Sequence, residues 1–141
     1  MDATQIALVR STFTALGRRE VEFATDFYER LFTIAPETRA MFPADMAAQR
    51  RKLVDQLTMI VGSLDRLPAL VAETSALGHR HAAYGALPQH YDLVLEAMLA
   101  AMAQQLGALM TPAAEQAWRR AYNLVAEVML HGAVHGPSTT S

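Results

Sequence analysis

Apolar residues recur along this chain at intervals of three and four, the spacing that places them on one face of an α-helix. No stretch alternates apolar and polar residues as a half-buried strand does, and the helix formers alanine and leucine are abundant. Glycine, proline and N-cap residues divide the pattern into about seven helical segments. They are predicted at residues 4–16, 19–33, 36–43, 45–63, 68–85, 88–106 and 111–132, the third being a short turn. The pattern therefore predicts an all-α fold.

The composition indicates one domain with its own core. The chain has 141 residues, 52% of them hydrophobic, and it shows neither an internal repeat nor a long linker. The domain is expected over residues 1–135. Residues 136–141 read Gly-Pro-Ser-Thr-Thr-Ser and are expected to form a flexible C-terminal tail.

Charge and cysteine usage exclude several classes of function. The formal net charge is −2 and the 12 basic residues are scattered, whereas a nucleic-acid partner requires a concentrated basic face. The chain has no cysteine, which excludes disulfides, thiol catalysis and iron–sulfur clusters. No signal-peptide pattern is visible and no apolar run reaches the length of a membrane span. We therefore expect a cytoplasmic protein without a nucleic-acid or membrane partner.

Three of the five histidines lie close together in the sequence, and their helical positions separate them. In the fifth predicted helix one inward stripe is formed by Leu70, Thr74, Leu77, His81 and Tyr84. His79 lies about 200° away around the helix from His81, so the two cannot chelate one ion. His90 follows a proline at the start of the next helix and flanks an inward tyrosine. His81 is therefore the histidine that faces the expected core.

An inward neutral imidazole has two plausible roles. Most such residues are hydrogen-bonded core histidines. The alternative is a metal ligand, because a neutral ring offers one nitrogen lone pair. One protein ligand cannot hold a bare ion, but it can hold an iron that arrives in a porphyrin, which supplies four nitrogens itself. The residues alone leave both roles open.

Four stretches in order resemble a known family. Leu77-Gly-His-Arg-His-Ala-Ala-Tyr-Gly is similar to the proximal-histidine segment of globins, above all bacterial single-domain globins, flavohaemoglobin globin domains and neuroglobin-like proteins. Residues 27–32, with Pro36 and Met41-Phe-Pro, resemble the second globin helix and the turn that packs on the haem. Residues 49–53 resemble the start of the distal helix, and residues 117–122 resemble part of the last helix.

The resemblance implies a globin fold around haem b and a role for each matching residue. His81 would be the iron ligand, with its other ring nitrogen oriented by a backbone carbonyl or a side chain. Phe42 would press on the porphyrin face. Tyr28 and Gln49 would donate hydrogen bonds to a bound gas, and Leu53 would wall the gas pocket. Such donors stabilise developing negative charge far better in a dry pocket than in water.

Further cofactor contacts follow from the same resemblance. Leu77, Tyr84 and Tyr91 would line the cofactor site, and Lys52, the only lysine, would lie near a haem propionate. In flavohaemoglobin-type globins a glutamate of the last helix joins the proximal histidine and tyrosine. The matching position here is Ala133, which puts peroxidase-like and strong oxygen-activating roles in doubt.

These residues imply reversible binding of dioxygen, and of CO and NO, at a five-coordinate ferrous iron, for carriage, storage or scavenging. No catalytic residue is assigned. The alternative is a nitric oxide dioxygenase that draws electrons from a separate reductase, since no glycine-rich dinucleotide fingerprint is present. A sensor and a haem-free helical interaction module are further readings. The resting iron could also be six-coordinate through Tyr28, water or hydroxide. A monomer or weak dimer is expected.

Overall fold

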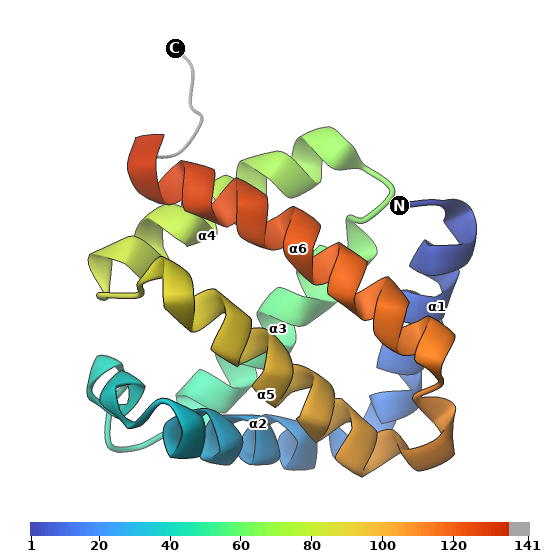
Figure 1. Ribbon diagram of the computed structural model, residues 1–141, viewed down its shortest axis with the longest axis horizontal. Coiled ribbons are helices and arrows are strands. Elements are labelled where there is room, and N and C mark those ends of the chain that lie inside the picture. Colours follow the sequence, from blue (N-terminus) through green and yellow to red (C-terminus); the bar gives the residue numbers. More distant parts are fainter. Residues whose placement is uncertain (136–141) are drawn as a thin grey trace.

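The computed structural model describes residues 1–135, with side chains described through residue 132, and it is all-α over that range (Figure 1). It contains six α-helices and three short 3₁₀ segments. The α-helices are α1 (Ala3–Leu16), α2 (Glu20–Ile34), α3 (Ala47–Gly62), α4 (Leu67–Ala83), α5 (Pro88–Leu106) and α6 (Pro112–His135). The 3₁₀ segments are η1 (Gly17–Arg19), η2 (Pro36–Met41) and η3 (Gly107–Leu109). The predicted tail at 136–141 lies outside the described residues.

Local chemistry sets the helix starts and stops. Asp2 caps α1 in a capping box with Gln5, which pairs two backbone N–H groups that the helix itself leaves free. Proline stands in the first turn of α4, α5 and η2, where its missing N–H costs nothing. Gly17 and Gly107 follow α1 and α5 with positive φ, a conformation that disfavours other residues.

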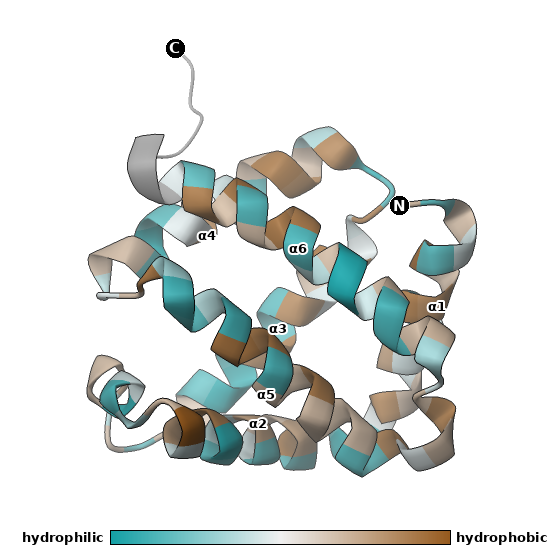
Figure 2. Ribbon diagram, in the orientation of Figure 1, coloured by the Kyte–Doolittle hydropathy of each residue, from teal (hydrophilic) through white to brown (hydrophobic). Residues whose placement is uncertain are grey.

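The helices pack in two main pairs. Figure 1 shows α4 against α6 at the top of the view and α2 against α5 at the bottom, and these are the two most extensive helix contacts. Each helix carries both apolar and polar positions along its length (Figure 2), so each can bury one face and expose another. The resulting core includes Phe23, Leu70 and Met102, all with almost no exposed surface.

The single tryptophan ties the last helix to the first. Trp118 on α6 is buried, and its indole N–H donates to the Thr12 hydroxyl on α1 over 2.7 Å. Thr12 passes the hydrogen bond on to the Leu8 carbonyl at 2.7 Å. A buried indole needs such a partner, because an unpaired buried donor is costly.

Two glycines let α4 and α6 touch backbone to backbone. A Cβ on Gly78 would overlap the carbonyl of Met129, and a Cβ on Gly132 would overlap the carbonyl of Ser75. Gly78 therefore contacts the α6 backbone three residues before Gly132, and Gly132 contacts the α4 backbone three residues before Gly78. This arrangement fixes the position of α4, and with it the segment that carries His81.

The structure corrects one sequence expectation about an element end. Gly132 was expected to cap the last helix, but α6 continues to His135, because Gly132 serves the close crossing with α4. The short turn predicted at residues 36–43 is the 3₁₀ segment η2. The all-α prediction is confirmed, with six α-helices among the described residues in place of about seven.

One helix changes the expectation about membranes. Residues 88–109 are long and apolar enough to cross a bilayer by length and composition alone. The expectation that no apolar run reaches that length was wrong on this criterion. Core helices of globular domains pass the same test, and α5 buries Leu95, Met98 and Met102 within this fold.

The backbone contact of α4 with α6 at Gly78 predicts a large stability difference between two glycine-to-alanine variants. Gly78→Ala should lower the free energy of unfolding by about 3 kcal/mol, the upper part of the range for overpacked cores, because helix backbone cannot yield as a flexible side chain can. Gly62→Ala is the matched control, since its Cβ would meet nothing within 4 Å. It should change stability by less than about 1 kcal/mol and in the stabilising direction. Urea unfolding of both variants measures the difference, and equal stability would contradict the close crossing.

Candidate functional site

The two proposed distal donors are in contact. Tyr28 on α2 is buried, and Gln49 on α3 is half-buried. The Gln49 Nε2 group donates a hydrogen bond to the Tyr28 hydroxyl oxygen over 3.2 Å. Because that oxygen acts as acceptor, the hydroxyl proton of Tyr28 stays available for a further partner. Burial raises the pKa of Tyr28, against a smaller opposing effect of the Gln49 hydrogen bond, so the hydroxyl keeps its proton at neutral pH.

Phe42 lies beside this pair in an aromatic cluster. Its ring centroid is 5.4 Å from that of Tyr28 and 5.6 Å from that of Phe32. Arg39 holds the backbone that follows η2, because its guanidinium donates to the carbonyls of Phe42, Pro43 and Ala44. Its Cζ also lies 5.2 Å from the Phe32 centroid, a cation–π contact. Sequence reasoning missed this arginine, whose effect is to hold Phe42 against the distal pair.

His81 occupies the last turn of α4 in one defined tautomer. Its Nδ1 lies 2.9 Å from the Leu77 carbonyl oxygen, and a carbonyl can only accept, so Nδ1 carries the proton. The Nε2 lone pair is therefore free for a metal. Desolvation, with a smaller contribution from the charge of Arg80, lowers the pKa of His81 despite the opposing hydrogen bond to Leu77. By surface area His81 is nevertheless exposed, so the expectation that it faces a buried core was wrong: the buried stripe of α4 ends at Leu77, one turn earlier. A ligand can therefore reach the ring.

A glycine-based cap ends α4 directly after His81. The Ala86 N–H donates to the His81 carbonyl at 3.0 Å, the Gly85 N–H donates to Ala82 at 3.1 Å, and Gly85 has a φ of 96°. This is a Schellman motif, which requires a left-handed residue after the helix. The expectation that Tyr84 faces inward was wrong: it is 69% exposed, because it lies at the helix end, where the helical period no longer applies.

His90 stabilises the start of the next helix. It is buried, and its Nδ1 accepts the Leu87 backbone N–H at 3.0 Å. Its Nε2 lies 3.4 Å from a carboxylate oxygen of Glu37 on η2. This histidine therefore has a capping role, which its position beside Tyr91 in the sequence did not indicate.

Tyr91 is buried at the first turn of α5, and burial raises its pKa. Tyr122 on α6 donates its hydroxyl to the Tyr91 carbonyl, so α6 fixes the backbone that carries this side chain. Burial also raises the pKa of Tyr122, which therefore remains a donor. The side chain of Ala133, the position of the expected glutamate, lies outside the described residues. Glu127, the nearest upstream acid in that helix, is exposed.

The remaining predicted contact residues differ in burial. Leu77 is buried in the core. Leu53 is half-buried and packs against the core from α3. Lys52 is exposed, a position compatible with either a propionate partner or simple solvation.

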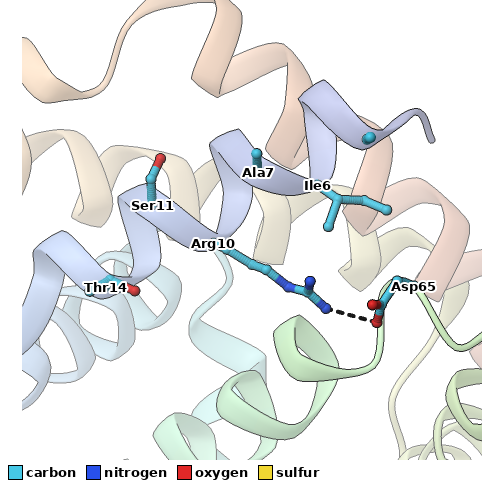
Figure 3. Close-up of a pocket in the computed structure, with 7 residues that line it drawn as sticks. Ile6, Ala7, Arg10, Ser11, Thr14 and Asp65 are labelled. Atoms are coloured by element: carbon cyan, nitrogen blue, oxygen red, sulfur yellow. Dashed lines mark hydrogen bonds and ion pairs between the residues drawn. The ribbon is translucent and has the colours of Figure 1, made fainter.

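A surface groove lies away from all of these residues, between α1 and the turn before α4 (Figure 3). Arg10 crosses it and donates to Asp65 at 2.9 Å, and to the carbonyls of Val61 and Gly62 at the end of α3. These bonds satisfy carbonyls that a helix end leaves free. The arginine therefore has a structural role, and the groove contains no predicted site residue.

The lowered pKa of His81 predicts how its charge changes with pH. In the haem-free protein its ring should titrate below 6.5, the ordinary histidine value, and should stay in the Nδ1–H form when neutral. Because the unfolded chain then binds a proton that the folded chain lacks, this group should reduce stability as pH falls below about 6.5. A ¹H–¹⁵N titration of the histidine ring nitrogens measures both properties. A neutral His81 protonated on Nε2 would contradict the tautomer.

Comparison with known proteins agrees with this geometry. The chain is 28% identical over 133 residues to a flavohemoprotein of Bacillus subtilis, covering 92% of this chain and 33% of that protein. It is 30% identical over 134 residues to a flavohemoprotein of Pseudomonas putida, covering 92% and 34%. It is 29% identical over 127 residues to an uncharacterized globin-like protein of Aquifex aeolicus, covering 89% and 88%.

The chain thus spans about a third of the length of these two flavohemoproteins. The family model for globins matches residues 25–129, a range that holds Tyr28, Phe42, Gln49 and His81. Since this match covers most of the chain, the protein belongs to the globin family.

Proposed function

We propose that this protein binds haem b through His81 and reversibly binds dioxygen and other diatomic gases at the haem iron. The observation that carries the proposal is the state of His81. Its Nδ1–H donates to the Leu77 carbonyl, which leaves Nε2 as the only ring atom able to bind a metal. A lowered pKa keeps the ring neutral, and a neutral ring is the form that binds metals.

Apolar side chains that follow η2 or lie on α3 would suit a flat apolar cofactor. Phe42, Leu53 and Ile60 are half-buried and pack against the core, so each keeps apolar surface available for contact. Haem, when bound, supplies an iron whose sixth position takes a diatomic gas. Leu77 and Tyr91 are proposed to contact the cofactor, and Lys52 to lie near a propionate.

Tyr28 and Gln49 are proposed to donate hydrogen bonds to the gas. Gln49 uses one N–H on the Tyr28 oxygen, which directs the Tyr28 proton away from Gln49 and leaves the second amide N–H free. Two donors of this kind stabilise a polar ligand such as dioxygen over an apolar one such as CO. This selectivity suits carriage, storage or scavenging of oxygen in the cytoplasm by a monomer or weak dimer.

Oxidation of nitric oxide by bound oxygen is the alternative role. This role needs an electron donor after each turnover. The two flavohemoproteins compared above are about three times as long as the region that this chain matches, so this chain corresponds to only part of each of them. A separate reductase would have to provide the electrons here. The gas-binding proposal does not depend on such a partner.

The ligand role of His81 predicts the visible absorption of the purified protein. A Soret band should shift on reduction and shift again on adding CO. His81→Ala should lose haem or exchange it rapidly with apomyoglobin, because no other ring nitrogen occupies its place. His79→Ala is the matched control on the exposed face of the same helix and should keep stoichiometric haem. A colourless wild-type protein that also takes up no added haem would remove the proposal.

The distal hydrogen bond predicts non-additive oxygen kinetics. Tyr28→Phe and Gln49→Leu should each raise the oxygen dissociation rate by about tenfold or more, the effect of losing one hydrogen bond to a charged acceptor. The double variant should show less than the product of the two effects, because Gln49 also orients the Tyr28 proton. Stopped-flow oxygen displacement measures this, with CO dissociation as the less sensitive control. Unchanged oxygen rates would mean that these side chains do not reach the gas.

A further inference from the structure

A buried histidine links the segment that precedes Phe42 to the start of α5. The side chain of His90 is 7% exposed, and its Nε2 atom lies 3.4 Å from a carboxylate oxygen of Glu37 on η2. At the same edge, a Cβ on Gly85 would lie 3.9 Å from the side chain of Met41. Figure 1 shows η2, directly after α2, beside the connection between α4 and α5 at the left of the view. The two segments therefore meet at two points.

Only one form of the His90 ring suits both of its partners. Nδ1 accepts the Leu87 backbone N–H at 3.0 Å, so this nitrogen carries no proton. A neutral imidazole then has its proton on Nε2, the nitrogen that faces Glu37. A doubly protonated ring would point an N–H group at the Leu87 N–H, and the Nδ1–H tautomer would point a lone pair at the carboxylate. His90 is therefore the Nε2–H tautomer, opposite to the tautomer of His81.

Each end of this link leads to a residue that is proposed to contact the haem. On η2, Arg39 donates to the carbonyls of Phe42 and of the two residues after it, which joins the Phe42 backbone to η2. On α5, Tyr91 follows His90 directly, and the Tyr122 hydroxyl donates to the Tyr91 carbonyl. The start of α5 is thus a fixed point, and the link fastens η2 to it.

We propose that Glu37 and His90 form a clasp that holds η2 against the start of α5 and slows the loss of haem from this edge of the site. The part concerning haem rests on the proposed function. Both are positioning residues: the clasp keeps Phe42 and Tyr91, two cofactor contacts on different elements, together. Glu37 is 61% exposed, and an exposed charge of this kind contributes little to stability. Its effect is therefore expected on the rate of haem loss and not on the folding of the domain.

The test measures haem transfer to apomyoglobin from Glu37→Ala, His90→Ala and the double variant. Glu37→Ala should speed haem loss by about two- to fivefold, the range of an exposed ion pair. His90→Ala should speed it by about tenfold, because it also leaves the Leu87 N–H without its acceptor. Glu73→Ala is the matched control, since it removes an exposed carboxylate from α4. It should leave the rate unchanged.

The double variant distinguishes a clasp from two unrelated contacts. It should lose haem as fast as His90→Ala alone, because Glu37 acts only through His90. Glu37→Gln should stay close to the wild-type rate, because its amide oxygen still accepts from the Nε2–H group. Independent effects of the two alanine changes, which multiply in the double variant, would overturn the inference. So would an unchanged rate in Glu37→Ala with normal haem content.

Failure of the wild-type protein to take up haem is a distinct outcome. It would remove the proposed function and the haem retention that rests on it. The clasp is then tested on the haem-free protein by ¹H–¹⁵N spectra of the histidine rings and by amide hydrogen exchange. His90 should be protonated on Nε2. Glu37→Ala should speed exchange of the Leu87 amide but not of the Ala114 amide, which the Thr111 side chain caps on α6. A neutral His90 protonated on Nδ1, or an unchanged Leu87 amide, would refute the clasp.

Discussion

The backbone contact between α4 and α6 is the constraint on which the proposed site depends. Gly78 and Gly132 remove the side chains that would separate the two helices, so each backbone lies against the other. His81 follows Gly78 by less than one turn, and the Schellman motif at Gly85 ends the helix immediately afterwards. The orientation of the imidazole is thus set by a rigid crossing on one side and a fixed helix end on the other. Precise orientation of a metal ligand requires such support.

The distal side is held by different means. Within residues 1–132 no close backbone contact at a glycine joins these elements. Instead Arg39 holds the backbone after η2, and the rings of Tyr28, Phe32 and Phe42 pack against one another between α2 and that segment. The hydrogen bond from Gln49 to Tyr28 then joins α3 to α2. Ligand orientation on the proximal side and gas selectivity on the distal side therefore depend on separate sets of contacts. Substitutions in one set are expected to leave the other largely unchanged.

The sequence predicted the helices well because breakers and periodicity are local signals. The sequence predictions failed at two positions near helix ends. Gly132 was interpreted as a cap because close helix packing leaves no local mark, and Tyr84 was placed inward because the period was extended past the helix end. The contact between Tyr28 and Gln49 joins residues 21 apart on two helices, so no local signal indicated it. The family resemblance implied only that both side chains would face the same gas.

The bond from Trp118 to Thr12 gives the protein a built-in optical probe. The only indole of the chain is buried where the first and last helices meet, so its emission reports whether those two ends of the fold are together. Haem absorbs at the wavelengths where tryptophan emits, and a bound porphyrin anywhere in a domain of this size would quench that emission by energy transfer. Without any label, one fluorescence signal therefore distinguishes three states: unfolded, folded without haem, and folded with haem.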